Sequence, residues 1–216
     1  MTVPQSTMVF IIDDDASVRK ALSRLLRSAG HACETYPSAE AFLARTPHAG
    51  PCCVVLDFRM PGLDGLALQE ALAAAGRDEP IIFITGHGDV PTCAKAMKAG
   101  AVDFLPKPFR DEELLTAIAK SLDQSRRFCQ EREARARIRA LVDRLTPREQ
   151  EVLDGVVGGK LNKQIAAQLG TCEKTVKVHR GRVMRKMGVV SVAELVRLTE
   201  KAGIGPENGG DGTKVQ

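Results

Sequence analysis

The sequence predicts an α/β domain with a doubly wound, five-stranded parallel sheet, followed by a long linker helix and a small all-α domain of four helices. Short apolar runs alternate with helical patterns through the first half of the chain. A stretch without glycine or proline then runs from residue 111 to about residue 144, and glycines divide the remainder into short helices. Alternating strands and helices with apolar strands favour a parallel sheet covered on both faces.

Five segments in the first half are predicted to be strands, at residues 9–12, 32–36, 53–56, 81–84 and 102–105, and all but the second are apolar runs. The helices between them are predicted at residues 17–29, 38–43, 66–75 and 90–99. Ser38 is expected to cap the second helix, while Gly30, Gly76 and Gly100 end the other three. A fifth helix begins at Asp111.

The fifth helix has no clear stop before residue 144. Its centre, residues 126–139, is dense in arginine and glutamate, with Glu131 and Arg135 one helical turn apart. Apolar residues are sparse there, and the a and d positions of a coiled coil are not filled. We therefore expect one long, mostly solvated linker helix, with a role between subunits as the alternative.

A second domain is expected to begin near Thr146. Thr146, Pro147 and Glu149 form a capping-box pattern with proline at the first helical position. Helices are predicted at residues 148–157, 162–169, 173–187 and 191–201, with Gly170 in a tight turn typical of a helix-turn-helix. The predicted division is residues 1–122, a linker helix at 123–143, the helical domain at 144–203 and a disordered tail at 204–216, in a segment that is glycine-rich and polar from residue 203.

Polar side chains stand at the carboxyl ends of four predicted strands: Asp13 and Asp14, Asp57, Thr85 and Lys107. These ends meet at one edge of a doubly wound sheet, where ligands bind. Three clustered carboxylates repel one another and favour a hard cation such as Mg²⁺. A lysine beside them can balance an incoming anion. The pattern predicts a site for moving a phosphoryl group.

At these residues the chain resembles the receiver domain of two-component response regulators, which has a flavodoxin-like fold. The resemblance covers roughly residues 7–122. It rests on Ile-Ile-Asp-Asp-Asp at residues 11–15, Leu-Asp-Phe-Arg-Met-Pro-Gly at 56–62, Ile-Thr-Gly-His-Gly at 84–88 and Phe-Leu-Pro-Lys-Pro-Phe at 104–109. All four motifs occur in order, each at a predicted strand end.

The resemblance implies roles for individual residues. Asp57 would accept phosphate from a sensor histidine kinase. Asp14, Asp57 and the backbone carbonyl of Arg59 would bind Mg²⁺, with Asp13 helping through water.

The same likeness leads to further expectations. Thr85 would act as a switch whose hydroxyl bonds the phosphate, and Phe104 would change rotamer as the threonine moves. Plain core packing is the alternative for Phe104. The bond between Lys107 and Pro108 is expected to be a cis peptide, which is largely a proline feature.

The third helix of the second domain is polar and basic, as suits a DNA major groove. Residues 145–198 resemble the LuxR/FixJ-type DNA-binding domain, through Asn-Lys-Gln-Ile-Ala at 162–166 and Lys-Thr-Val-Lys-Val-His-Arg at 174–180. The likeness implies base contacts from Lys177 and Val178 and phosphate contacts from Lys174 and Thr175. The other expected DNA-contacting residues are Lys163, His179, Arg180 and Arg182.

Two residues depart from that family's pattern. Cys172 stands where a serine-like cap is usual, and its thiol is a poor cap for the third helix. Gly181 occupies a position that can carry a longer side chain in that family. Because glycine has no side chain, we expect fewer base contacts at this position.

Charge and composition agree with two functions in one chain. The net charge of +4 combines −4 over residues 1–125 with +8 over residues 126–216, which favours nucleic acid as the partner of the second half. The six cysteines form no CxxC pair and are expected to be small apolar residues in a reducing compartment. No run approaches the length of a membrane span and the first eight residues do not read as a signal peptide, so we expect a soluble, cytoplasmic protein.

The predicted function is a DNA-binding transcriptional regulator controlled by phosphorylation of Asp57. Phosphorylation would release the DNA-binding domain or promote a homodimer that reaches two promoter half-sites, with RNA polymerase as a further partner. The alternatives are a phosphotransfer relay or phosphate sink, against which the complete helix-turn-helix argues, and a regulator whose receiver is only a dimerisation scaffold, against which the complete pocket argues. No enzymatic output is expected beyond the receiver's own phosphotransfer and dephosphorylation.

Overall fold

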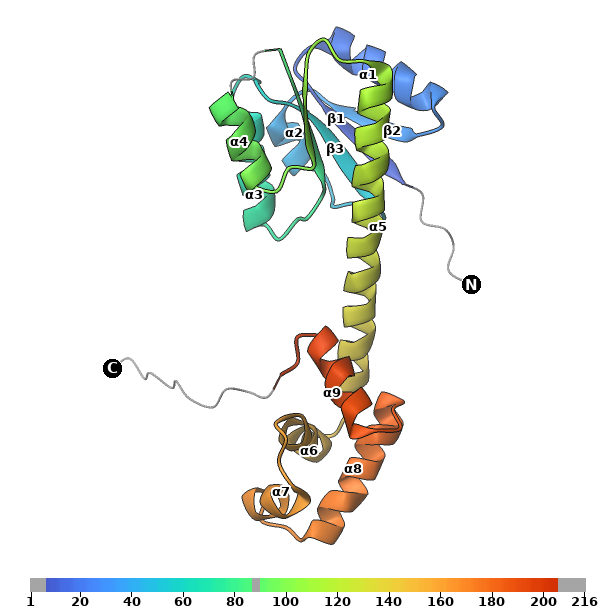
Figure 1. Cartoon of the computed structure of the whole chain (residues 1–216), viewed down its shortest axis with the longest axis vertical. Coiled ribbons are helices and arrows are strands. Elements are labelled where there is room, and N and C mark those ends of the chain that lie inside the picture. Colours follow the sequence, from blue (N-terminus) through green and yellow to red (C-terminus); the bar gives the residue numbers. More distant parts are fainter. Residues whose placement is uncertain (1–6, 87–89, 206–216) are drawn as a thin grey trace, which may run out of the picture. The chain divides into compact units, whose positions relative to one another are not determined.

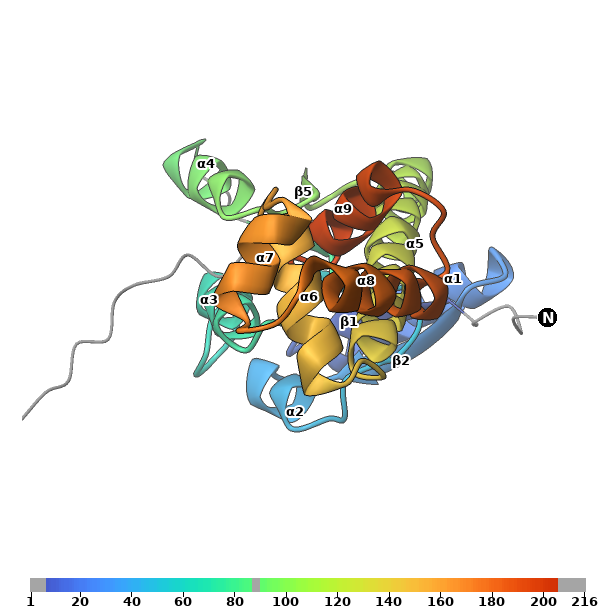
Figure 2. The same ribbon diagram turned by 90° about the horizontal axis from the view of Figure 1, so that it is seen from below.

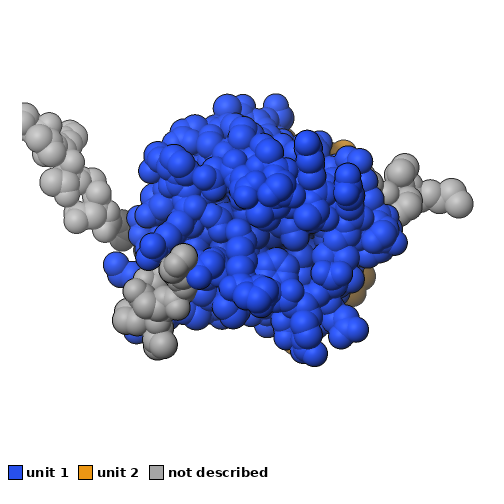
Figure 3. All heavy atoms as spheres, turned by 90° about the horizontal axis from the view of Figure 1, so that it is seen from above, with its two compact units in different colours: residues 1–130 blue, residues 131–216 orange. Residues whose placement is uncertain are grey.

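The structure is a computed structural model that describes residues 7–86 and 90–205 of the chain. The chain divides into two compact units, Met1–Gln130 and Glu131–Gln216, coloured separately in Figure 3. Helix α5 (Asp111–Val142) crosses this boundary, so it contributes residues to both units.

The first unit contains the predicted five-stranded parallel sheet, with the strand order β2-β1-β3-β4-β5. The strands are β1 (Met8–Ile12), β2 (Ala32–Tyr36), β3 (Cys52–Asp57), β4 (Ile81–Thr85) and β5 (Asp103–Pro106). Every residue of β3 and β4 is buried. The predicted parallel sheet is confirmed. Its central strands are apolar throughout because both faces of the sheet are covered.

Helices cover both faces of the sheet, as Figure 1 shows. They are α1 (Ala16–Ser28), α2 (Ala39–Leu43), α3 (Gly65–Ala74) and α4 (Val90–Lys98), together with the first part of α5. Val9 and Ile11 of β1 point to a core shared with α1 and α5, whereas Phe10 and Ile12 point to a core shared with α2, α3 and α4. This alternation of side chains along one strand divides the two core layers.

Polar side chains cap the starts of α1 and α2, and the cap of α2 is the predicted one. The Asp15 carboxylate accepts a hydrogen bond from the backbone N–H of Ser17 at 2.7 Å and caps α1. The Ser38 hydroxyl accepts from the N–H of Ala41 at 3.2 Å and caps α2. Gly30 follows the end of α1 with φ +83°, a backbone conformation that favours glycine.

Strand β5 differs from the prediction of a buried strand. Val102, which precedes it, is buried, but Phe104 and Leu105 are only half-buried. The cause is position, since β5 is the last strand in the sheet order and pairs only with β4. One side of this edge strand is therefore left uncovered by the sheet.

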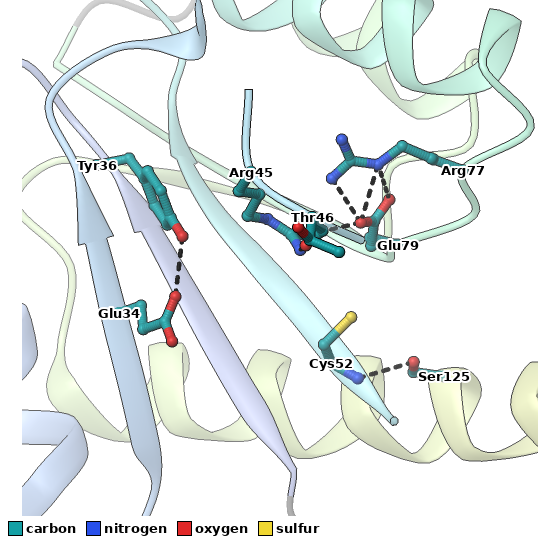
Figure 4. A network of polar contacts seen from close by, with 8 residues as sticks. All are labelled: Glu34, Tyr36, Arg45, Thr46, Cys52, Arg77, Glu79 and Ser125. Carbon is teal, nitrogen blue, oxygen red and sulfur yellow. Dashed lines mark hydrogen bonds and ion pairs between the residues drawn. The ribbon is translucent and has the colours of Figure 1, made fainter. Parts of the chain in front are cut away.

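A buried ionic cluster lies at the amino-terminal edge of the strands (Figure 4). Glu79 accepts hydrogen bonds from Arg45 at 2.7 Å and from Arg77 at 2.7 Å. The guanidinium of Arg45 also stacks 3.9 Å from the ring centre of Phe10 and 4.3 Å from that of Phe42. The cluster ties together the loops before β3 and β4, on the edge opposite the strand ends where ligands bind.

Helix α5 is one continuous helix, as predicted, and it ends at Val142, one residue before the predicted end of the linker helix at residue 143. The Ser125 hydroxyl accepts a hydrogen bond from the backbone N–H of Cys52 at 3.0 Å, which fixes the helix to β3 (Figure 4). No side chain from residue 126 to residue 137 is buried. The middle of α5 is therefore mostly exposed along this stretch, with only Phe128, Cys129 and Glu133 half-buried.

The second unit is all helical, as predicted (Figure 2). Its helices are α6 (Pro147–Val157), α7 (Asn162–Gln168), α8 (Glu173–Met187) and α9 (Val192–Lys201). Its core contains Ile138 from the end of α5 together with residues of all four helices. Ile204, placed by the sequence in a disordered tail, packs against this core and donates its backbone N–H to Thr199. The rest of the predicted tail from residue 206 lies outside the described residues.

A buried carboxylate joins three segments of the second unit. Glu149, only 3% exposed, completes the predicted capping box by accepting from the backbone N–H of Thr146 at 2.9 Å. It also accepts from the Lys186 ammonium at 2.6 Å, and the same ammonium donates to the backbone carbonyl of Arg144 at 3.1 Å. The last turn of α8 is thereby bound to the start of α6 and to the turn after α5.

Among the described residues, no helix combines the length and the apolar composition that a membrane crossing requires.

We predict that Lys186→Met destabilises the second unit, because it leaves a buried carboxylate without its cation. The loss in the free energy of unfolding should be about 1 kcal/mol, because the Lys186 side chain is 37% exposed and solvent screens its ion pair; urea unfolding of the full chain measures it. Hydrogen bonds from Lys186 and the Thr146 backbone lower the pKa of Glu149 to about 2. In the wild type the contribution of Glu149 is thus complete above its ordinary pKa near 4.5 and lost as the pH falls toward 2.

The acid-unfolding midpoint of Lys186→Met should therefore lie at a higher pH than that of the wild type. Arg185→Met is the matched control, since it removes an exposed positive charge from the same helical turn. Equal acid midpoints for the two variants would contradict the role assigned to the Glu149 contact.

Candidate functional site

The three aspartates predicted from the strand ends lie together. The parallel register pairs Ile12 of β1 with Leu56 of β3, so the next residues, Asp13 and Asp57, are neighbours across the two strands. Asp14 follows at the start of the loop. One carboxylate oxygen from each of the three lies within 4.8 Å of the others, with Asp13 and Asp57 buried and Asp14 exposed.

Lys107 reaches this cluster from the loop after β5. Its ammonium donates to Asp13 at 2.9 Å and to Asp57 at 3.0 Å. Its backbone N–H donates to the carbonyl of Thr85 at 2.6 Å, and the bond to Pro108 is cis, as predicted. Lys107 and Asp13 are 94 positions apart in the sequence, so only the folded sheet brings them into contact.

The electrostatics of the cluster favour an added cation. Burial raises the pKa of Asp57, and the neighbouring Asp13 and Asp14 raise it further, against the lowering effect of Lys107. Burial alone would lower the pKa of Lys107, but its hydrogen bonds with Asp13 and Asp57 outweigh burial and raise it. Lys107 therefore stays charged, and one ammonium faces three carboxylates.

The acidic cluster could hold a divalent metal ion. Its donors are hard carboxylate oxygens, which Mg²⁺ prefers, and the exposed Asp14 leaves the cluster accessible to solvent. Arg59 lies two residues beyond Asp57, and its side chain is exposed.

The two residues expected to act as a switch lie on neighbouring strands. Thr85 ends β4 and is 1% exposed. Phe104 on β5 is half-buried, with its ring 6.0 Å from that of Phe58 and 6.2 Å from that of Phe83. Phe104 thus packs at the rim of the core beside the uncovered edge of the sheet.

The second candidate site is the outer surface of α8. Val176, Val183 and Met187 face the core, which fixes the rotation of the helix. Lys174, Lys177 and Val178 are exposed on the other side, and the side chain of Val178 is 49% exposed although it is apolar. The exposed basic residues on or beside this surface are Lys163 of α7 and Lys174, Lys177, Arg182 and Arg185 of α8.

The other residues predicted to contact DNA face partly inward. Arg180 donates to the side-chain oxygen of Asn162 at 3.1 Å, which links α8 to the start of α7. The Nδ1 atom of His179 is buried. The Thr175 hydroxyl lies 3.2 Å from the sulfur of Cys172.

The sequence predicted the N-cap of α8 but not the hydrogen bond between Asn162 and Arg180. Cys172 stands at the N-cap of α8, as predicted, and its side chain makes no capping hydrogen bond. The pairing of Asn162 with Arg180 was missed, because both lie in motifs assigned to DNA contact and nothing in their spacing separates the two roles.

Comparison with known proteins agrees with this division of the chain. Residues 9–119 match the response regulator receiver domain, and residues 143–199 match the luxR family of bacterial regulatory proteins. Nodulation protein W of Bradyrhizobium diazoefficiens is 47% identical over 91% of this chain and 87% of its own length. Transcriptional regulatory protein FixJ of Azorhizobium caulinodans is 43% identical over 94% of this chain and 97% of its own length.

A solved structure shows the same architecture. The response regulator StyR is 50% identical, and its structure aligns with a TM-score of 0.76 over 91% of this chain and 99% of its own. The chain therefore belongs to the response regulators that join a receiver domain to a luxR-family DNA-binding domain, and it is a transcriptional regulator controlled by phosphorylation.

Proposed function

We propose that Asp57 is the phosphoacceptor and that a sensor histidine kinase is the donor. The observation that carries this is the contact of the Asp57 carboxylate with Lys107 at 3.0 Å inside the cluster of three aspartates. One oxygen of Asp57 attacks the phosphorus of a phosphohistidine. A P–O bond forms as the P–N bond breaks, and the departing imidazole nitrogen keeps the electron pair and takes a proton from solvent.

Asp14, Asp57 and the backbone carbonyl of Arg59 would hold Mg²⁺, with Asp13 acting through water. The bound ion would neutralise charge on the phosphoryl oxygens during transfer. Lys107 already lies between Asp13 and Asp57, so its ammonium can turn to a phosphoryl oxygen on Asp57. The same groups would support the receiver's own dephosphorylation.

The phosphoryl group would be read out through Thr85 and Phe104. A hydroxyl at the end of β4 can move to donate to the new phosphoryl oxygen. The space that it leaves would admit the ring of Phe104, which now lies at the rim of the core. Repacking of the exposed side of β5 would then favour a homodimer or release of the second unit.

In the second unit, α8 would enter the DNA major groove. Lys177 and Val178 would reach base edges, while Lys174, Thr175, Arg182 and Lys163 would contact phosphates. His179 and Arg180 would support the helix from its partly buried side. Two copies in a dimer would place two such helices on two promoter half-sites, with RNA polymerase as the next partner and the cytoplasm as the compartment.

The proposal assigns residues 1–122 to the receiver, 123–143 to the linker helix, 144–203 to the DNA-binding domain and 204–216 to a tail, whose first residue, Ile204, packs against the core of the second unit. The exposed middle of α5, residues 126–137, supports a linker between two folded parts. As a helix it would act as a semi-rigid spacer.

We predict that Asp57→Asn abolishes phosphate incorporation from ³²P-labelled acetyl phosphate, because an amide cannot form the acyl phosphate. Circular dichroism should show that the variant remains folded, since asparagine keeps the size of aspartate. Removal of Mg²⁺ with a chelator should also abolish labelling of the wild type.

Asp64→Asn is the matched control. Asp64 caps α3 by accepting from Ala67 at 2.8 Å, and asparagine is an equally good cap, so this variant should be labelled like the wild type. Undiminished labelling of Asp57→Asn would place the phosphoacceptor elsewhere.

We predict different effects for two lysines of α8. Lys177→Ala should relax sequence preference at one base pair and cost about 1–3 kcal/mol of binding free energy there. Lys174→Ala should weaken binding to all sequences alike and reduce the dependence of affinity on salt. Fluorescence anisotropy on specific and shuffled duplexes at several salt concentrations measures both, and exchanged effects would mean that α8 is rotated from this arrangement.

A further inference from the structure

Three described glycines lie inside or at the first residue of a helix, and two of them are explained by packing. A Cβ atom on Gly65 would lie 2.9 Å from the backbone oxygen of Asp57 and from the Phe83 ring. A Cβ atom on Gly155 of α6 would lie 2.8 Å from the side chain of Ile165. Glycine at these two positions lets neighbouring elements approach closely.

Close packing does not explain Gly181 of α8. A Cβ atom built there would meet no heavy atom of the described chain within 4 Å. Its φ is not in the left-handed region that favours glycine, and it lies in the middle of an unbroken helix. A glycine inside a helix makes the helix less stable than an alanine at the same position would. Nothing within the described fold therefore requires a glycine at this position.

The position of Gly181 points to a requirement outside the chain. It follows Val178 by three residues and Lys177 by four, and it precedes Arg185 by four, so these residues share one side of the helix. That side is opposite the buried residues Val176 and Val183. Gly181 is exposed and lies between basic side chains on the surface that faces DNA in the proposed function.

We propose that Gly181 is a specificity-determining position, where a DNA base edge approaches the backbone of α8 more closely than a Cβ atom would permit. The inference rests on the proposed contact between α8 and DNA. The basic side chains on either side of Gly181 suit contacts with DNA phosphates, whereas Val178 and Gly181 are uncharged. An uncharged, small surface suits the edge of a base, such as the methyl group of thymine.

The experiment begins by selecting duplexes from a random pool with the full-length wild-type chain, incubated with Mg²⁺ and acetyl phosphate. Affinity for the enriched duplex and for a shuffled duplex is then measured for the wild type, Gly181→Ala and Gly181→Leu. Gly181→Ala should raise the melting temperature of the chain and weaken binding to the enriched duplex about tenfold, with little change on the shuffled duplex. Gly181→Leu should weaken specific binding further, because its side chain is larger.

Gly155→Ala is the control for the structural argument. It should lower the melting temperature, because its Cβ meets Ile165, so the two alanine variants should change stability in opposite directions. A melting temperature for Gly181→Ala at or below that of the wild type would reveal a requirement within the fold and overturn the inference.

The binding data can overturn the inference in two other ways. Equal affinity of Gly181→Ala and the wild type for the enriched duplex would exclude close approach at this position. Equal weakening on both duplexes would mean that a phosphate, not a base edge, lies there. A wild-type chain that enriches no duplex would instead overturn the proposed function and this inference with it.

Discussion

The bridge from Lys107 to Asp13 and Asp57 is the interaction on which the pocket at the strand ends of the first unit depends. It joins residues at the ends of three strands, with contacts of 2.9 and 3.0 Å. Two buried carboxylates so close together need a positive charge, and one ammonium cannot balance three carboxylates. The pocket is thus held together in a state that still favours a metal ion. Because Lys107 binds the carboxylate that we propose as phosphoacceptor, a phosphoryl group on Asp57 would change the contacts of the same lysine.

The second unit contains an analogous contact, in which the carboxylate is buried and the ammonium is partly exposed. Glu149 holds the ammonium of Lys186 at 2.6 Å, and that ammonium also binds the carbonyl of Arg144 in the turn after α5. The end of α8 is thereby attached to the segment that leaves α5. Since Arg180 is bound to Asn162 at 3.1 Å, the middle of α8 is also attached to α7. These contacts hold α8 without using the residues on its outer side. Those residues are therefore available to bind DNA in the proposed function.

The sequence predicted features that depend on local chemistry or on strand order. The strand ends converge in any doubly wound parallel sheet, so Asp13, Asp57 and Lys107 could be placed together from their positions alone. The capping box at Thr146 is equally local. The half-buried face of β5 was missed, because its apolar residues resemble those of a central strand. The pairing of Glu149 with Lys186 was missed because 37 residues separate the partners and no periodicity connects them.

The central claim is that chemistry at Asp57 controls DNA binding by α8. The most direct test measures the affinity of the full-length chain for a selected duplex before and after addition of beryllofluoride with Mg²⁺, which mimics a phosphoryl group on a carboxylate. We expect affinity to rise in the wild type and to remain unchanged in Asp57→Asn, with DNA binding itself intact in that variant. Affinity that is the same with and without beryllofluoride in the wild type, or that responds equally in Asp57→Asn, would contradict the account.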